Sequence, residues 1–339
     1  MQSFRTAFHV SALAAIVALG SGCAFFFGPA QRPASSEKVE ANEAMVARGK
    51  YLAENVSLCI HCHSQRDFKR FSMILKPGTE GGGGDCFGEE VGMPGTVCGS
   101  NITPHKENGI GAWTDGEILR AMREGVDRDG ETLFPMMPYQ KLRSMSDADA
   151  HSVVAFLRTL KPNANKPPPT EVDFPVSRVL NFVPEPLEGP VPEPDRTDSA
   201  KYGEYLVTIA ACADCHTPVN DRHEPLEGMH LAGGQEMVLK GIVDVRTPNL
   251  TPDKETGLTQ TRDAFIRRFR AFGADPEATA VAVTPAQQTL MPWIDYGGMT
   301  EEDLGAIWDY LQTIPAVSNK VQVRKEGATQ LAPPAPPPT

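Results

Sequence analysis

Helical spacing of apolar residues dominates the hydrophobic pattern of this chain. In residues 146–162, apolar side chains recur three and four positions apart behind Ser146, a residue type that often caps helices. Residues 300–315 repeat this arrangement, and the segments GEILRAMREG and DAFIRRFRAF have the same period. No segment alternates cleanly between apolar and polar positions, as a half-buried strand would. The pattern therefore predicts an all-α fold.

The chain also contains an internal repeat. RGKYLAEN near its beginning matches YGEYLVTI in its second part, NITP matches NLTP, and MMPY matches LMPW. The two long helical segments match each other as well, and the order and overall spacing are kept. We therefore expect one small helical domain used twice, in residues 41–161 and again in residues 198–318.

Pro-rich sequence separates the two copies and also ends the chain. Residues 162–197 contain KPPPT and PEPLEGPVPEP, a composition that favours extended backbone and cannot build a core by itself. We expect this segment to be a connector between the two domains. Residues 319–339 end in APPAPPPT and are expected to form a disordered tail.

The N-terminus has the composition of an export signal. Arg5 precedes a stretch from Ala7 to Gly28 that carries no charged residue, and within it small residues lead to Cys23. We assign residues 1–22 to a signal peptide and residues 23–40 to a linker. The signal is similar to those of bacterial lipoproteins, in which the cysteine is lipidated; ordinary cleavage and an uncleaved anchor are the alternatives. Each of them predicts a protein exported to the periplasmic side, where a lipid on Cys23 would attach it to the membrane.

The charge of the chain limits its partners. Its 339 residues carry a net charge of −11, which argues against nucleic acid or an acidic membrane surface as a partner. Hydrophobic residues make up 40% of the sequence, enough to bury substantial cores.

One five-residue motif occurs in both copies, as CIHCH at residues 59–63 and CADCH at residues 212–216. Two thiols three positions apart and followed by His suit covalent attachment of haem c, because the thiols add to the haem vinyl groups and the imidazole binds the iron. Zinc would need further ligands nearby, and a thioredoxin-like redox pair would not explain the His. We predict two haem c groups, attached through Cys59, Cys62, Cys212 and Cys215, with His63 and His216 as iron ligands.

The second iron ligand is predicted to be methionine in each copy. Met137 and Met291 each precede Pro and an aromatic residue, at nearly the same distance from the haem motif. A thioether is a soft ligand that raises the reduction potential of haem iron. Met136 is the main competitor in the first copy. The weaker candidates are Met93 and Met299, and His223 or His230 as the second ligand of a bis-His iron.

Two cysteines remain, and they flank a Gly-rich insertion. In an oxidising compartment, Cys86 and Cys98 are expected to form a local disulfide bond, with two free thiols as the alternative. The histidines outside the haem motifs, and His61 within the first motif, are expected at the surface.

The order of these motifs resembles that of class I c-type cytochrome domains. More narrowly, CxxCH followed by NITP, FPMMPY and a final amphipathic helix is similar to the haem subunits of bacterial membrane-bound alcohol and gluconate dehydrogenases. Those subunits usually resemble three-haem chains, whereas this chain has two motifs. The resemblance implies a helical fold around each haem, His63 with Met137 and His216 with Met291 as ligand pairs, and electron relay to a further carrier.

These patterns favour an electron carrier over an enzyme. We expect an exported dihaem cytochrome c that relays single electrons from a dehydrogenase subunit to a downstream cytochrome or oxidase. Six-coordinate irons would leave no open position for a substrate. The alternative is a dihaem enzyme, such as a cytochrome c peroxidase or a sulfur-compound oxidase, with one open-site haem.

Overall fold

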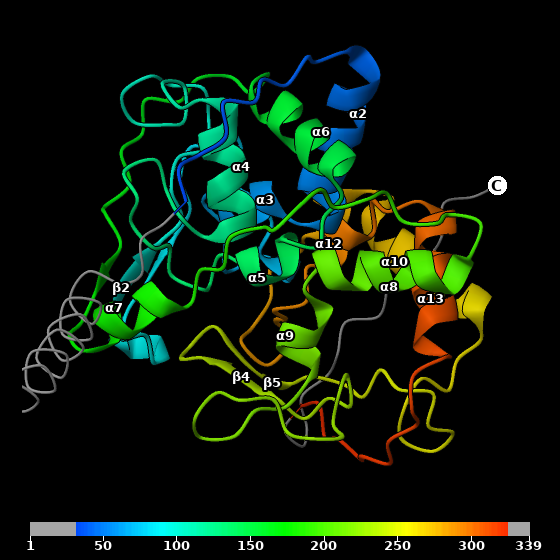
Figure 1. The fold of residues 1–339 in the computed structure, drawn as a ribbon. Helices are drawn as coiled ribbons and strands as arrows, with labels where there is room; N and C mark the ends of the chain where they lie inside the picture. The colour runs from blue at the N-terminus through cyan, green and yellow to red at the C-terminus, as the bar shows by residue number, and fades with distance from the viewer. Residues whose placement is uncertain (1–31, 325–339) are drawn as a thin grey trace, which may run out of the picture.

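Each copy of the repeat contributes one pair of crossing helices, α2 with α6 and α8 with α13 (Figure 1). This computed structural model describes residues 32–324; the predicted signal peptide and Cys23 lie outside the described residues. We call residues 41–161 the first repeat and residues 198–318 the second. The helices are α2 (Glu43–Tyr51), α3 (Cys59–Cys62), α4 (Asp115–Glu124), α5 (Tyr139–Leu142), α6 (Asp147–Leu157), α7 (Val176–Val179), α8 (Ser199–Ile209), α9 (Cys212–His216), α10 (Arg262–Gly273), α11 (Pro276–Thr279), α12 (Trp293–Tyr296) and α13 (Glu301–Leu311), with a π-helical turn at Leu52–Val56 and 3-10 turns at Phe71–Met73, Glu89–Val91 and Leu180–Phe182.

The four long helices that the periodicity predicts are confirmed. Ser146 caps α6 by accepting a hydrogen bond from the backbone N–H of Asp149, and Thr300 caps α13 in the same way. The segments GEILRAMREG and DAFIRRFRAF lie in α4 and α10, and Thr114 forms a capping box at the start of α4. Local side-chain chemistry therefore fixes where these helices begin.

A glycine lies at each helix crossing. In the first repeat, α2 packs against α6, and a Cβ placed on Gly49 would lie 1.7 Å from the backbone oxygen of Ser152. In the second repeat, α8 packs against α13, and a Cβ on Gly203 would lie 1.9 Å from the backbone oxygen of Ala306. The helix backbones touch at both crossings, which explains why RGKY and YGEY share a glycine at the same position.

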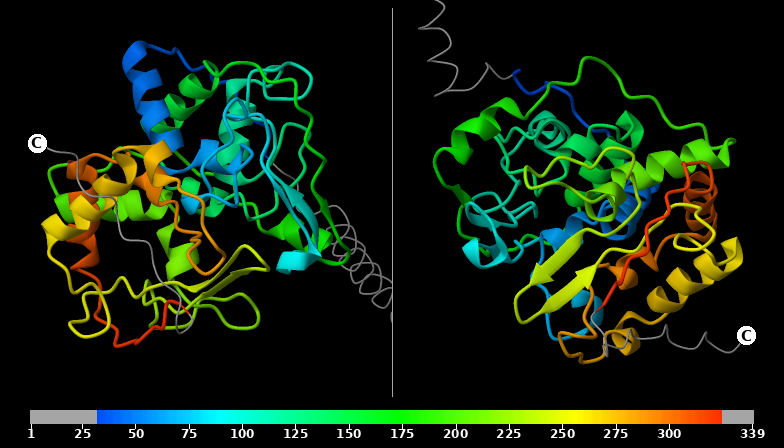
Figure 2. Two further views of the ribbon diagram at one scale, coloured as in Figure 1. Left: turned by 180° about the vertical axis from the view of Figure 1, so that it is seen from behind. Right: turned by 90° about the horizontal axis from the view of Figure 1, so that it is seen from below.

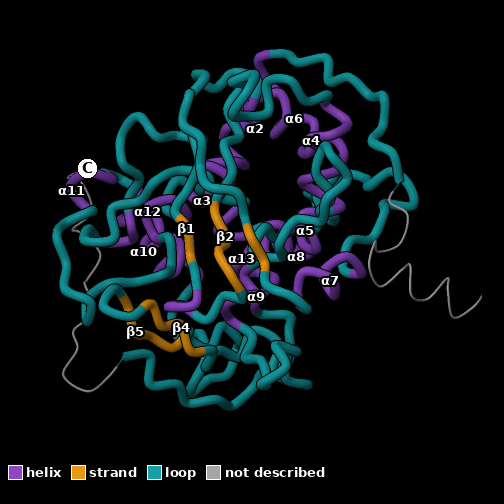
Figure 3. Tube along the Cα trace, turned by 90° about the vertical axis from the view of Figure 1, so that its left-hand side faces the viewer, coloured by secondary structure: helices purple, strands orange, loops and turns teal. Residues whose placement is uncertain are grey.

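The expectation of an all-α fold is wrong. Only 35% of the described residues are helical, and they also include two antiparallel sheets. Long loops, drawn in teal in Figure 3, connect the elements. The strands escape the periodicity because they have only two to four residues, too few for an alternating pattern to stand out. One sheet contains β1 (Cys86–Phe87), β2 (Gly95–Cys98) and β3 (Glu171–Val172), and the other contains β4 (Glu236–Leu239) and β5 (Val243–Arg246). This mixed architecture does not confirm two tandem class I cytochrome c domains.

The first sheet joins the insertion to the Pro-rich connector. Cys86 and Cys98 face each other across β1 and β2, and a disulfide bond connects them. The connector adds β3 to the free edge of β2, where Gly95 pairs with Val172. The connector is therefore hydrogen-bonded to the first repeat and is more than a spacer.

The second sheet holds the start of the predicted tail. β4 and β5 form a hairpin, seen from below in the right view of Figure 2. The backbone N–H of Arg246 donates to the oxygen of Val323, and the Asn319 side chain donates to the oxygen of Ala232. Residues 319–324 thus pack on the second repeat, whereas the prediction placed the disordered tail from residue 319.

The two repeats meet through a reciprocal pair of hydrogen bonds. Tyr51 of the first repeat donates to Asp303 at 2.6 Å, and the matched Tyr205 of the second repeat donates to Asp149 at 2.6 Å. Burial and the neighbouring carboxylate raise the pKa of both tyrosines. Burial opposes ionisation of Asp149, but the hydrogen bonds and charge of Arg48 prevail and lower its pKa. The two contacts are therefore equivalent, with the tyrosine of each repeat bonded to the matched aspartate of the other.

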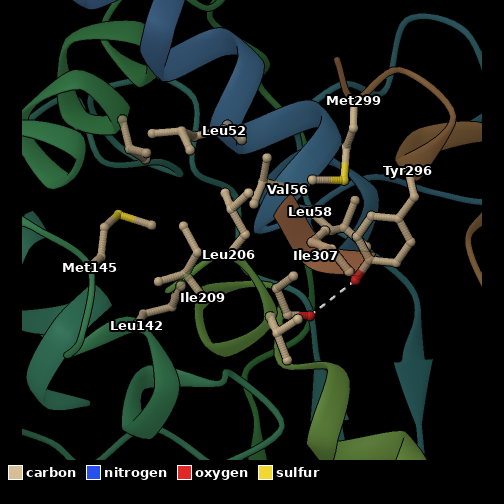
Figure 4. Close-up of a cluster of buried hydrophobic side chains, with 14 of the residues drawn as sticks. Leu52, Val56, Leu58, Leu142, Met145, Leu206, Ile209, Tyr296, Met299 and Ile307 are labelled. Carbon is tan, nitrogen blue, oxygen red and sulfur yellow. Dashed lines mark hydrogen bonds between the residues drawn. The ribbon is translucent and has the colours of Figure 1, made fainter. Parts of the chain in front are cut away.

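A common hydrophobic cluster lies behind these hydrogen bonds. Leu52 and Val56 of the first repeat belong to the same cluster as Leu206 and Ile307 of the second (Figure 4). The segment around Phe71 strengthens the contact, since the Phe71 ring stacks on Phe272 at 5.5 Å. Each repeat therefore buries apolar surface against the other.

Removing the two tyrosine hydroxyls should weaken this contact. Tyr51→Phe and Tyr205→Phe each take a hydrogen bond from a partly or fully buried carboxylate, so each should lower the free energy of unfolding by about 1.5–3 kcal/mol. Urea unfolding followed by circular dichroism measures the change. Tyr310→Phe is the control, because the first repeat already has Phe156 at the matched position. Equal stability of Tyr51→Phe and the control would contradict the assigned role.

Candidate haem centres

Both CxxCH motifs fold into a short helix behind the same backbone turn. Leu58, before α3, has φ 54°, and Ala211, before α9, has φ 53°. This left-handed conformation is uncommon for residues other than glycine. Its occurrence at both motifs shows that the repeat extends to backbone geometry, and it fixes the direction in which each motif helix leaves the preceding helix.

None of the four motif cysteines forms a disulfide bond with another described residue, and their surroundings disfavour thiolates. Cys59 and Cys212 are half-buried, while Cys62 and Cys215 are exposed. Burial raises the pKa of Cys59 and of Cys212 to about 12. A thioredoxin-like redox pair needs a lowered thiol pKa, so this environment argues against such a pair. Within residues 32–324, no cluster of three or more His, Cys, Asp or Glu side chains could hold a metal ion.

The two motif histidines are oriented by backbone carbonyls. Nδ1 of His63 lies 2.7 Å from the oxygen of Ser100, and Nδ1 of His216 lies 3.0 Å from the oxygen of Pro248. A carbonyl can only accept, so Nδ1 carries the proton and Nε2 keeps its lone pair. Burial lowers the pKa of both histidines and keeps the rings neutral. A neutral imidazole with a free Nε2 is the form that binds haem iron, so these residues fit the cofactor.

The repeated NITP and NLTP motifs position those carbonyls. The Asn101 side chain accepts from Thr103 and donates to the oxygens of Asn163 and Asn165 beyond α6. Asn249 accepts from Thr251 and donates to the oxygen of Val317 beyond α13. Each asparagine thus ties the loop beside the haem-motif histidine to the segment after the last helix of its repeat. The sequence shows the repeated motif but not this role.

The candidate distal ligands occupy matched places. Met137 and Met291 both pack against the hydrophobic cluster that also borders Cys59 and Cys212. In each case the next aromatic residue donates its backbone N–H to the methionine oxygen, at 2.8 Å from Tyr139 and 2.9 Å from Trp293. The two methionines therefore share the same backbone turn, and their assignment as iron ligands stays a prediction.

The competing candidates lie in different surroundings. Met136 is 42% exposed, which disfavours it as a ligand next to Met137. Met299 is 1% exposed and belongs to the cluster in Figure 4, as does Met145 at the matched position of the first repeat. Met93 lies in the loop between β1 and β2, and His223 and His230 are exposed in the loop between α9 and β4.

The two haem motifs approach one another across the contact between the repeats. Tyr296 is buried, and it follows Asp295, which lies 3.1 Å from Nδ1 of His61 in the first motif. Its hydroxyl donates to the oxygen of Ala210, drawn as the dashed line in Figure 4. Residues 295 and 296 therefore contact both the first motif and the turn just before the second motif, which brings the two motifs close together.

The expectation that His61 lies at the surface is wrong. His61 is 6% exposed, and its Nδ1 lies 3.1 Å from Asp295 of the second repeat. At the matched place, Asp214 pairs with Lys141 of the first repeat at 3.3 Å. The third residue of each motif thus contacts the other repeat. Sequence periodicity carries no signal for such a contact.

Comparison with known proteins identifies relatives of this chain. No family model matches the chain. The chain is 28% identical over 300 residues to the cytochrome subunit of fructose dehydrogenase from Gluconobacter japonicus, covering 86% of this chain and 57% of that protein. It is 30% identical over 294 residues to the cytochrome c subunit of a quinone alcohol dehydrogenase from Gluconobacter oxydans, covering 82% and 56%. It is 26% identical over 265 residues to a dihaem c-type cytochrome from Cereibacter sphaeroides, covering 76% and 82%.

The chain spans little more than half the length of the two dehydrogenase subunits and most of the dihaem cytochrome. A gluconate 2-dehydrogenase cytochrome c subunit from Pantoea cypripedii is a further relative. The resemblance inferred from the motifs is therefore confirmed: the homologues of this chain are cytochrome c subunits of quinone alcohol, fructose and gluconate dehydrogenases and a dihaem cytochrome c.

Proposed function

We propose that this chain is a dihaem cytochrome c that receives single electrons from a dehydrogenase and passes them to a downstream respiratory acceptor. The proximity of the two matched CxxCH motifs, which residues 295 and 296 bridge, supports this proposal. When bound, the haem irons supply the one-electron redox chemistry. The chain holds the cofactors through Cys59, Cys62, Cys212 and Cys215.

The neighbouring residues would set the properties of each centre. His63 and His216 are held neutral, with Nε2 available for iron. Met137 and Met291 are proposed as the opposite ligands, and thioether ligation raises the reduction potential. Two such centres, one on each side of the contact between the repeats, suit electron transfer from one haem to the other. Two thioether-ligated irons would leave no open position for a substrate.

The relatives guide the choice of partner and location. Their dehydrogenases oxidise alcohol, fructose or gluconate according to their names, so enzymes of these three kinds are the first donors to test. We place the protein on the periplasmic side of the membrane, held there by its N-terminal segment and in the lipoprotein form by lipid on Cys23. In residues 32–324, no helix has both the length and the hydrophobicity to span a bilayer.

Haem content and spin state test the proposal directly. Holoprotein produced in cells with the cytochrome c maturation machinery should contain two covalently bound haems per chain, both low-spin when oxidised. A redox titration should consume two electrons, and a dehydrogenase given its substrate should reduce both haems. One haem per chain would reject the relay between two haems. Two haems of which one contains high-spin iron that reacts with peroxide would instead support a dihaem enzyme.

A further inference from the structure

The Pro-rich connector exposes an unusual cluster of large apolar side chains. Phe174, Val179 and Phe182 are 70%, 55% and 49% exposed, and they fall within nine residues around α7. Other strongly exposed large apolar side chains of the described residues lie singly elsewhere. The segment FPVSRVLNFV, residues 174–183, is mostly apolar and lies at the edge of the molecule beside β2 (Figure 1). A cluster of this kind usually marks a contact surface.

The fold holds this segment away from the core at both of its ends. On one side, β3 pairs with β2, and the N–H of Asp173 donates to the oxygen of Pro94 at 3.0 Å. On the other side, Arg143 forms an ion pair with Glu185, and Arg32 donates to the oxygen of Leu187 at 2.8 Å. These contacts present the apolar side chains to the surroundings instead of allowing them to collapse onto the protein.

The N-terminal end of the described residues lies beside the same region. Arg32 lies against Leu187, only four residues after Val183. Arg32 comes only nine residues after Cys23, whose lipid would attach the protein to a membrane in the lipoprotein form. A segment held close to that attachment point meets the bilayer at high effective concentration. Apolar and aromatic side chains of short helical segments bury readily in the interfacial zone of a membrane.

We propose that residues 174–183 form a second membrane contact, with Phe174, Val179 and Phe182 inserted among the lipids beside the N-terminal attachment. This inference rests on the membrane attachment proposed above. The acidic residues Glu171 and Glu188 flank the segment, and the chain carries a net charge of −11, so anionic lipid gives no advantage. Binding should therefore be as strong on zwitterionic phosphatidylcholine as on anionic vesicles, and insensitive to salt.

Hydrogen exchange on vesicles tests this contact in the full-length holoprotein. With phosphatidylcholine vesicles, the backbone amides of residues 174–183 should exchange more slowly than in solution. The triple variant Phe174→Ser, Val179→Ser and Phe182→Ser should lose this protection and transfer between vesicles at least about tenfold faster. The control variant Leu226→Ser with Val281→Ser removes apolar side chains that are 41% and 47% exposed in the second repeat, and it should behave like the unaltered protein.

The outcomes separate the two proposals. Protein that sediments with vesicles while residues 174–183 exchange as in solution would overturn the second contact and leave the N-terminal attachment standing. Protein that does not sediment would overturn both. Protection that appears only when a dehydrogenase is added would show that a protein partner covers the segment, and would also overturn the membrane contact. If the triple variant does not fold, Phe174→Ser and Phe182→Ser are measured singly.

Discussion

Replacing Met137 or Met291 by alanine should convert one haem iron from low-spin to high-spin and leave the other unchanged. Alanine has no atom that can bind iron, so the position opposite His63 or His216 would become open or take up water. Loss of the thioether should also lower the reduction potential of that centre by on the order of tenths of a volt, within the range that axial ligands control. Visible and electron paramagnetic resonance spectra of the oxidised protein, with a redox titration, measure both effects.

The matched control for this experiment is Met136→Ala. Met136 adjoins Met137 but is 42% exposed, so its loss should leave both spectra and both potentials unchanged. Met299→Ala is a second control, because it removes a buried methionine of the hydrophobic cluster and should reduce stability without creating high-spin iron. High-spin iron in the Met136 or Met299 variant, with an unchanged Met137 or Met291 variant, would reassign the ligand.

Adding a single methyl group at a helix crossing should have the largest effect on stability. Gly49→Ala and Gly203→Ala each drive a Cβ into backbone, toward the oxygens of Ser152 and Ala306. Backbone cannot swing aside as a flexible side chain can, so the paired helices must separate and each variant should lose about 3 kcal/mol, the upper end for overpacking. Thermal unfolding followed by circular dichroism measures the loss.

Gly189→Ala provides the comparison for these variants. A Cβ on Gly189 meets no atom within 4 Å, so this change should alter stability by less than about 0.5 kcal/mol. If Gly49→Ala were as stable as Gly189→Ala, the close contact of α2 with α6 would not exist in solution.

Sequence reasoning located the long helices because their determinants are local. Ser146 and Thr300 cap α6 and α13 through side-chain hydrogen bonds to residues three positions away. The repeat likewise pointed to Met137 and Met291, which the structure places in matching turns. Residues that act within a few positions of their partners leave a readable pattern.

The strands were missed for two different reasons. β1 and β3 have two residues each and depend on pairing with β2, so no local pattern could reveal them. The β4–β5 hairpin left a weak signal, because Val243 and Val245 alternate with polar residues after Gly241, whose φ is 76°. That signal was outweighed by the strong helical period elsewhere.

Contacts between the repeats were equally hidden. Tyr51 and Tyr205 stand out as a repeated residue, yet their partners Asp303 and Asp149 lie far away in the sequence. His61 shows the same limit, since its neighbour Asp295 belongs to the other repeat. These pairs depend on how the two repeats pack against each other, and a local sequence pattern contains no information about that packing.

The pairs at residues 61 and 295 and at residues 214 and 141 bear on how the duplicated halves recognise each other. In a contact between two copies of the first repeat, His61 would face Lys141, and neither side chain would have an acidic partner. Two copies of the second half would set Asp214 against Asp295, with like charges opposed. Only the mixed arrangement joins acid to base at both places. The two repeats have therefore diverged at this contact, so that each is complementary to the other and not to a second copy of itself.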